Sequence, residues 1–415
     1  MSAMPFRFSK RFDEAACDFC GLCLHECPVL GLPLEEAQFE IRGLVRDGRS
    51  KVLAECTGCM ACNSFCPQEA NPHTLIVSRW EARYRQEGIP VRGRVVLPYQ
   101  RPNLFTLGVA GLPADEKALV EAWGRNWRDP RGEDTMLYAG CNMLLQPFLL
   151  DSSVLGGVPI FGSTSICCAE PLYRMGCWDA AQVAAAWVRD EFRRMGLRKV
   201  IVPCLGGYHM FRHVYPEVFD VDLDCEVVSV TDWLLDRIES GALAVNALGK
   251  QAVIHDSCWS KASGDHFFDG VRALLSRVGV TVVEPAHTRE AALCCGMCAP
   301  AARFSLLDIL RAAKARLLEL EAAEADVAVD YCGGCNWLLS LASSVSSAKL
   351  TKPLYHVLEL VQMAAGERPK HRTDARARQV LKSTAVKVLP GYLSRRRFRI
   401  DAIEGRLVRG SAEGC

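Results

Sequence analysis

Cysteine usage is the feature that most constrains this chain. Its 415 residues include 21 cysteines. Disulfide-rich folds are mostly short and secreted, whereas this chain is long and its first residues lack the apolar core of a secretory leader. Dense cysteine in such a chain favours metal binding, and the spacing of the cysteines decides which metal.

The first eight cysteines form two copies of the pattern C-x2-C-x2-C-x3-C-P. Three thiolates at this spacing can wrap one corner of an iron–sulfur cube, and the fourth cysteine ligates the other cluster in two-cluster ferredoxins. This rule predicts two [4Fe-4S] cubanes, one held by Cys17, Cys20, Cys23 and Cys66, the other by Cys27, Cys56, Cys59 and Cys62. Structural zinc uses separated ligand pairs and does not require the third cysteine or the C-P ending.

The insertion between the two motifs is 28 residues long and includes the helical-looking stretch Leu34–Val45. It is too long for a minimal ferredoxin hairpin. The segment resembles the α-helical ferredoxin module of fumarate reductase and glycerol-3-phosphate dehydrogenase iron–sulfur subunits.

From Met136 the chain repeats itself with a period near 117 residues, the distance from Cys141 to Cys258. Each copy begins with a buried strand that leads to a cysteine, and a cysteine pair follows. An amphipathic helix and a second strand come next, and this strand leads to one or two further cysteines. Open α/β sheets place ligands beyond the carboxyl ends of their strands. We therefore expect two α/β lobes that present cysteines to a shared region.

The second copy resembles the CCG domain of heterodisulfide reductases, with Gly296 after its cysteine pair. This resemblance implies a noncubane iron–sulfur cluster on Cys258, Cys294, Cys295, Cys332 and Cys335. The first copy departs from the pattern, because Ala169 replaces the glycine and Gly207 replaces the last cysteine. Four thiolates remain for a cubane or an altered cluster, namely Cys141, Cys167, Cys168 and Cys204. Cys177 and, more weakly, His209 are candidates for a fifth ligand.

The whole arrangement resembles the catalytic subunit of heterodisulfide reductase, and it is also similar to the iron–sulfur subunits of glycerol-3-phosphate dehydrogenase and glycolate oxidase. The expected fold is α+β and multidomain, an α-helical ferredoxin module followed by two repeated α/β CCG lobes. The expected divisions are a two-cluster ferredoxin-like domain (1–87) and a linker (88–133). A degenerate first CCG-like lobe (134–248), a complete second CCG lobe (249–366) and a basic C-terminal extension (367–415) are expected to follow.

No G-x-G-x-x-G motif or P-loop is visible, so flavin or nicotinamide is expected on partner subunits. The favoured function is that of an iron–sulfur electron-transfer subunit of an oxidoreductase complex, linking the cubanes and the CCG-lobe clusters to a flavoprotein, disulfide or quinone partner. One alternative is a reductase that cleaves a thiol disulfide, with the five second-copy cysteines as catalytic residues. Another is an iron–sulfur scaffold.

The expected location is the cytoplasm, because no apolar stretch approaches the roughly 20 residues that span a bilayer. Membrane association through a partner is compatible with this. Residues 367–415 contain 13 basic and 5 acidic residues, with the densest patch at Arg395, Arg396, Arg397 and Arg399. This segment is interpreted either as a solvated tail or as a surface that docks onto an acidic partner protein. No nucleic-acid partner is expected, because no binding motif accompanies the patch.

Several residues near the motifs have open roles. His255 is expected either to donate a proton to a cluster sulfur or to orient it by hydrogen bonding. Cys298 is interpreted as a small packing residue beside the second-copy cluster, with a protective hydrogen bond as the alternative. Cys225 and Cys415 belong to no motif, and Trp259 and Lys261 are assigned no role.

Overall fold

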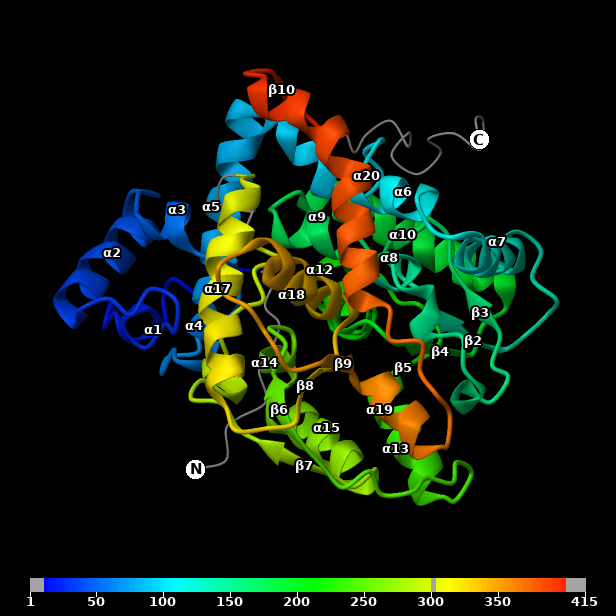
Figure 1. Cartoon of the computed structure of the whole chain (residues 1–415). Helices are drawn as coiled ribbons and strands as arrows, with labels where there is room; N and C mark the ends of the chain where they lie inside the picture. The colour runs from blue at the N-terminus through cyan, green and yellow to red at the C-terminus, as the bar shows by residue number, and fades with distance from the viewer. Residues whose placement is uncertain (1–10, 300–303, 401–415) are drawn as a thin grey trace.

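Helices surround two four-stranded parallel sheets in the computed structural model (Figure 1), which describes residues 11–299 and 304–400. The predicted α+β class is therefore confirmed. Cys415 and the last part of the basic extension lie outside the described residues. Within the described ranges, no helix is both long and apolar enough to cross a membrane.

The N-terminal segment is helical, and its cysteines lie in the loops and short helices between the longer elements. The predicted helix over Leu34–Val45 is present as α2, whose buried side chains Ala37, Ile41 and Leu44 follow helical spacing. In Figure 1 these first helices lie to one side of the two sheets. They are α1 (Leu22–His25), α2 (Leu34–Arg46), α3 (Val52–Glu55), α4 (Ala61–Ser64) and α5 (Pro72–Glu87).

The range 88–133, predicted to be a linker, contains regular elements rather than extended chain. Asn103 caps one of its helices, because its side chain accepts hydrogen bonds from the N–H groups of Phe105 and Thr106. A longer helix, α7, follows in the same range. The elements are β1 (Ile89–Pro90), η1 (Val91–Val96), α6 (Leu104–Ala110) and α7 (Ala114–Arg128).

The first repeat, residues 134–248, forms a parallel sheet with the strand order β3-β2-β4-β5. Its central strands carry the apolar runs that the sequence indicates, and Met136 and Val200 are fully buried. The strands are β2 (Thr135–Tyr138), β3 (Ile160–Phe161), β4 (Lys199–Val202) and β5 (Glu226–Ser229). The helices are α8 (Cys141–Leu144), η2 (Pro147–Leu149), η3 (Ser153–Leu155), α9 (Glu170–Arg174), α10 (Trp178–Met195), α11 (Leu205–His209), η4 (Met210–Val214), α12 (Tyr215–Phe219) and α13 (Val230–Glu239).

The second repeat, residues 249–366, forms a parallel sheet with the order β7-β6-β8-β9. Its strands are β6 (Lys250–His255), β7 (Val280–Val283), β8 (Val327–Asp330) and β9 (Leu354–His356). Its helices are α14 (Ser260–Ser263), α15 (Asp265–Arg277), η5 (Arg289–Ala291), α17 (Leu306–Ala322), α18 (Gly333–Val345) and α19 (Val357–Ala364).

The two sheets share one topology. Across each sheet, the repeat's second strand comes first, followed by its first, third and fourth strands. The first and third strands are adjacent at the centre of each sheet, and their connections leave toward opposite edges. Such a switch point creates a crevice at the carboxyl ends of the strands. Cys141 and Cys204 follow the two central strands of one sheet, and Cys258 and Cys332 those of the other.

The described part of the C-terminal extension forms a long helix, α20 (Thr373–Leu393), followed by β10 (Arg397–Phe398). Helix α20 packs against α18, α6 and η1, and β10 pairs antiparallel with β1. Ala377 and Val380 are buried in this contact. The segment to residue 400 is therefore part of the folded molecule and not a solvated tail.

Candidate iron–sulfur sites

The structure brings Cys66 beside the three cysteines of the first N-terminal motif. Burial raises the pKa of the Cys23 thiol, and the nearby sulfurs of Cys66, Cys20 and Cys17 raise it further. Cys66 likewise contributes to the raised pKa of Cys17 and of Cys20, after burial. The fourth cysteine of the second motif thus lies where the ferredoxin rule requires it, while ligation of a cluster by these four residues stays a prediction.

The other four N-terminal cysteines form a second group next to the first. Burial raises the pKa of Cys62, and the sulfurs of Cys56, Cys27 and Cys59 add to this effect. Cys23 of the first group also contributes, which places the two groups side by side. Two cubanes held here would be close neighbours.

The five cysteines predicted for the second repeat converge at the carboxyl end of its sheet. Cys335 Sγ lies 3.2 Å from Cys295 Sγ. Cys332 lies beside Cys335, and Cys294 beside Cys295, because each neighbour shifts the pKa of the other thiol. Burial raises the pKa of Cys258 to about 11, with contributions from Cys295 and Cys332. All five thiols therefore lie together.

Gly296, which follows the cysteine pair, has a steric reason to be glycine. Its φ is +96°, and a Cβ at this position would lie 2.5 Å from the carbonyl oxygen of Ile309. Ala169, its counterpart in the first repeat, also has a positive φ of 63° but caps the short helix α9. The backbone at this position is therefore left-handed in both repeats, although the first repeat has alanine in place of glycine.

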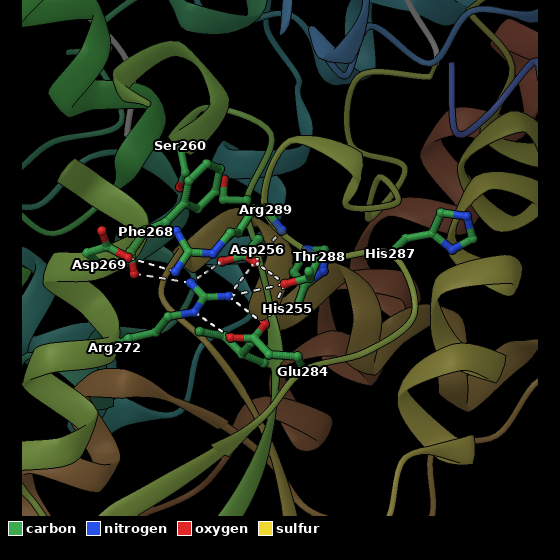
Figure 2. Close-up of polar contacts among 12 residues, drawn as sticks. His255, Asp256, Ser260, Phe268, Asp269, Arg272, Glu284, His287, Thr288 and Arg289 are labelled. Atoms are coloured by element: carbon green, nitrogen blue, oxygen red, sulfur yellow. Dashed lines mark hydrogen bonds and ion pairs between the residues drawn. The ribbon is translucent and has the colours of Figure 1, made fainter. Parts of the chain in front are cut away.

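Asp256 ties together the loops that carry the cysteines of the second repeat (Figure 2). Its buried carboxylate accepts hydrogen bonds from Arg272 at 2.9 Å, from the Tyr331 hydroxyl at 2.7 Å and from the backbone N–H of Arg289 at 2.8 Å. Tyr331 directly precedes Cys332, and Arg289 begins the short helix η5 on the way to the cysteine pair. One carboxylate thus fixes three separate chain segments around the site.

The charge of Asp256 is maintained by its partners. Burial alone would raise the pKa of this carboxyl group, but the hydrogen bonds and charge of Arg272 outweigh burial and hold the pKa at about 2. Figure 2 shows Arg272 between Asp256 and Glu284. The Arg272 side chain therefore bridges two carboxylates, with a 2.6 Å contact to Glu284.

His255 lies at the sulfurs of Cys295 and Cys335, since the ligand atoms of these three residues lie within 4.8 Å of one another. Arg316 Nε donates a 2.9 Å hydrogen bond to Nδ1 of His255. The proton of a neutral imidazole is then on Nε2, so this N–H can form a hydrogen bond to a sulfur. Burial lowers the pKa of His255, and the Arg316 charge adds to this. A neutral ring suits the orienting role, the second of the two predicted for this residue.

The four cysteines of the first repeat also lie together. Cys141 is close to Cys167, Cys168 and Cys204, each of which affects its pKa. Gly207, like Cys335, stands three residues after a strand-end cysteine, and a Cβ at Gly207 would lie 3.9 Å from Cys168 Sγ. The glycine thus occupies the place of the missing thiolate.

The two repeats face each other through matching contacts. Asn142 and Trp259 each follow the first cysteine of their repeat, and His209 and Trp337 each stand five residues after the strand-end cysteine. Trp337 donates a 3.1 Å hydrogen bond to Asn142, while Trp259 stacks on His209 with ring centroids 5.4 Å apart. These pairs bring the cysteine-bearing strand ends of the two sheets together.

Cysteines from both repeats line a cavity at this junction. Cys204 of the first repeat lies beside Cys332 of the second, and this neighbour and burial raise the pKa of Cys204. The lining includes Cys141, Cys168 and Cys204 on one side and Cys258, Cys295 and Cys335 on the other. The shared region expected from the sequence is therefore present.

Sequence reasoning missed two buried cations beside these thiols. Arg174 is 1% exposed, and its Nη2 lies 3.4 Å from Cys258 Sγ. Burial acts to raise the pKa of Cys56 and Cys59, and the Arg174 charge acts to lower both. Arg174 therefore also faces the second N-terminal group. Lys261 is buried too, donates to the Ala292 carbonyl at 2.8 Å and lies close to Cys59.

A sequence signal for Arg174 does exist. Glu170 and Arg174 stand four residues apart directly after the cysteine pair, a spacing at which opposite charges meet on a helix. The structure places their Oε1 and Nε atoms 3.9 Å apart, and Glu170 accepts a 2.8 Å hydrogen bond from Trp259. Two charged residues beside buried cysteines indicate a local electrostatic role.

The remaining cysteines have different surroundings. Cys177 lies at the start of α10, close to Glu81 and Asp179, and not with the four cysteines of its repeat. Cys225 lies near Asp222 and Asp224. Cys298 is buried in the cavity wall, 3.9 Å from the Glu170 carboxylate and close to Cys258. Of the three, Cys298 alone borders the predicted cluster sites.

The thiol groups have the chemistry that iron–sulfur clusters need. Every cysteine within residues 11–299 and 304–400 is a free thiol. Burial and neighbouring sulfurs raise the pKa of Cys62, and the neighbouring Cys167 thiol together with burial raises that of Cys168, so these two thiols need a compensating cation to ionise. A bound metal supplies that charge and deprotonates its thiols outright.

Replacing Arg174 with methionine is expected to lower the reduction potential of a cluster bound by Cys258. Removing a buried positive charge disfavours added electrons, and each 1.4 kcal/mol corresponds to about 59 mV for a one-electron couple. We expect a shift on the order of 60 mV, while Arg174→Lys keeps most of the potential. A redox titration followed by electron paramagnetic resonance measures both.

Arg277→Met is the matched control, because Arg277 is exposed and pairs with Glu239 in solvent. Its substitution is expected to leave the potential unchanged, since solvent screens exposed charges. Equal potentials for Arg174→Met and Arg174→Lys would contradict an electrostatic role for Arg174.

Two protein families match this chain. A 4Fe-4S dicluster domain matches residues 9–67, and a cysteine-rich domain of the CCG type matches residues 252–340. Iron–sulfur clusters are therefore the cofactors, while their number and type stay proposals.

Known relatives agree with these families. One component of the dihydromethanophenazine:CoB–CoM heterodisulfide reductase from Methanosarcina mazei is 26% identical over 336 residues, which is 75% of this chain and 77% of that protein. EtfAB:quinone oxidoreductase from Syntrophomonas wolfei is 26% identical over 266 residues, or 60% of this chain and 36% of that protein, so the chain spans about a third of its length. These matches confirm the predicted resemblance to heterodisulfide reductase, and the chain is an iron–sulfur subunit of the oxidoreductase class.

Proposed function

We propose that this chain transfers electrons between two N-terminal [4Fe-4S] cubanes and a noncubane cluster in the second repeat, within a larger redox complex. The observation that carries this proposal is the contact between Cys59 and Cys294. These two residues pack together with Ala61 in one buried cluster, and Cys258 packs against it. The Cys59 sulfur is close enough to contribute to the raised pKa of Cys294.

This contact joins two ligand sets that the sequence assigns separately. Cys59 belongs to the second N-terminal set, whereas Cys294 belongs to the CCG set more than 200 residues later. When bound, the clusters supply one-electron carriers. The protein's own part is to bury their ligands against each other and to place the Arg174 charge between them and the Lys261 charge beside Cys59, which favours electrons moving without crossing solvent.

We further infer that the first repeat is a degenerate CCG lobe. Its strand order matches that of the second repeat, and its four cysteines occupy corresponding places after the strands. A cluster there would have four thiolate ligands and would differ in type from that of the second repeat.

A second candidate function is the reduction of a disulfide in the cavity between the repeats. The contact of Cys204 with Cys332 favours it, because it places cysteines of two ligand sets on one cavity. The physiological partner is proposed to be a flavoprotein, a quinone reductase or a disulfide-containing substrate. The names of two relatives, heterodisulfide reductase and EtfAB:quinone oxidoreductase, mention a disulfide and a quinone.

Stepwise reduction of the iron-loaded chain tests both functions. The chain is reduced anaerobically with less than one equivalent of reductant, frozen at intervals and followed by electron paramagnetic resonance. We expect the signals of the cubanes and of the second-repeat cluster to respond in sequence. The reduced chain is then divided between a soluble quinone analogue and a small thiol disulfide.

The outcomes separate the candidates. Reoxidation by the quinone without cleavage of the disulfide supports electron transfer to a redox partner. Release of two thiols per disulfide supports the reductase. Cubanes that reduce and reoxidise while the second-repeat cluster never changes would contradict both and leave the scaffold function.

A further inference from the structure

We propose that the end of helix α20 binds directly to an anionic membrane surface. Val386, Leu389 and Leu393 stand at positions i, i+3 and i+7, so they lie on one face of the helix. Their side chains are 80%, 61% and 80% exposed. We call these three residues the apolar stripe of α20.

The stripe is distinct from the face of α20 that packs on the protein. Ala377, Val380 and Thr384 are buried on that face and are at most 7% exposed. The helix thus has one apolar face that stabilises the fold and a second, near its C-terminal end, that does not. In Figure 1 this end of α20 and β10 lie at the top of the molecule, away from the two sheets.

Basic residues surround the stripe. Between residues 375 and 400 the chain has eight lysines and arginines and no acidic residue. Lys387, Arg395 and Arg396 are exposed close to the stripe in sequence. A groove beside the end of α20 adds Arg92 and Arg94 from η1.

This combination fits a bilayer with anionic headgroups better than other occupants. An amphipathic helix end with aliphatic side chains and cations lies in the membrane interface, with its apolar residues in the acyl boundary. Anionic lipids attract the cations. A second copy of this chain would bring two basic surfaces together, and nucleic acid offers nothing for three aliphatic side chains to bind.

The inference does not depend on the clusters or on the proposed electron transfer, because binding to lipid is measured without turnover. It would place the chain at the surface where a membrane-bound partner or a lipid-soluble electron carrier is found. It differs from the expectation that the basic segment docks onto an acidic protein.

Sedimentation of the full chain with lipid vesicles tests the proposal. Vesicles of phosphatidylcholine alone are compared with vesicles that also contain about a third phosphatidylglycerol. We expect binding to the anionic vesicles that weakens with added salt. The double substitution Leu389→Gln and Leu393→Gln is expected to weaken it roughly tenfold or more.

The matched control is Leu318→Gln, since Leu318 is 51% exposed on α17. This variant is expected to bind as the unchanged chain does. Because all these side chains are exposed, the variants are expected to fold, which circular dichroism verifies. Absence of binding to anionic vesicles, or equal binding by the double variant, would overturn the proposal. Light scattering that shows a dimer dissolved by the double substitution would overturn it in favour of contact between copies.

Discussion

Replacing Cys335 with serine is expected to remove or convert the cluster of the second repeat while both N-terminal cubanes persist. Cys335 is 3% exposed, and its sulfur lies 3.2 Å from that of Cys295 and close to Cys332. A serine oxygen is a harder ligand than the thiolate that iron–sulfur clusters prefer. We expect the iron content to fall and one set of resonance signals to disappear or change.

The measurement is low-temperature electron paramagnetic resonance after stepwise reduction, together with iron analysis. Cys225→Ser is the matched control, because Cys225 is a half-buried thiol whose charged neighbours are Asp222 and Asp224 rather than other cysteines. It is expected to leave every signal in place. An unaltered spectrum and iron count in Cys335→Ser would show that Cys335 is not a ligand, and the CCG assignment would be wrong at its most specific residue.

Cysteine spacing predicted the local groupings well because those ligands lie on short loops. In the first motif, Cys17, Cys20 and Cys23 are held together by the chain itself, so the sequence alone indicates their proximity. The apolar runs that become β2, β4, β6 and β8 were also readable, because a buried parallel strand is a short continuous apolar segment. Both features are local in the sequence.

The long-range contacts were not readable from spacing. Packing of separate elements produces the contacts of Cys204 with Cys332 and of Cys59 with Cys294. The two-residue strand β3 is too short to show a periodic pattern. Proline and glycine in residues 87–103 favoured an extended connector, but burial of Val95 and Leu97 stabilises the helical segment η1 there instead.

Buried charges were missed for a related reason. Arg174 and Lys261 carry side chains that are normally exposed, so apart from the spacing of Glu170 and Arg174 little in the sequence indicated that they are buried. Their burial is understandable only once the thiols around them are known, because thiolates offer the negative charge that a buried cation needs. The thiol ligands of the site are therefore predictable from the sequence, whereas the buried cations beside them are not.

Replacing Gly207 with cysteine is expected to give the first repeat the fifth thiolate that it lacks. The backbone at Gly207 is compatible with a side chain, since the residue lies within helix α11 and its φ is not positive. A Cβ there would lie 3.9 Å from Cys168 Sγ and 3.2 Å from Val202 Cγ1. The valine side chain must shift by a few tenths of an ångström, which makes room for a sulfur beside Cys168.

The expected result is a change in the resonance signal of the first repeat toward that of the second, with the signal of the second repeat unchanged. Gly207→Ala is the control, because it adds the same Cβ without a ligand and is expected to leave the spectrum nearly as it was. Tyr138 stands where His255 stands in the second repeat, three residues before the first cysteine, so it offers no imidazole to orient the new sulfur. Adding Tyr138→His to Gly207→Cys is therefore expected to bring the two signals closer still. Identical spectra and iron contents for Gly207→Cys and Gly207→Ala would show that the first repeat is not a CCG lobe lacking a single ligand.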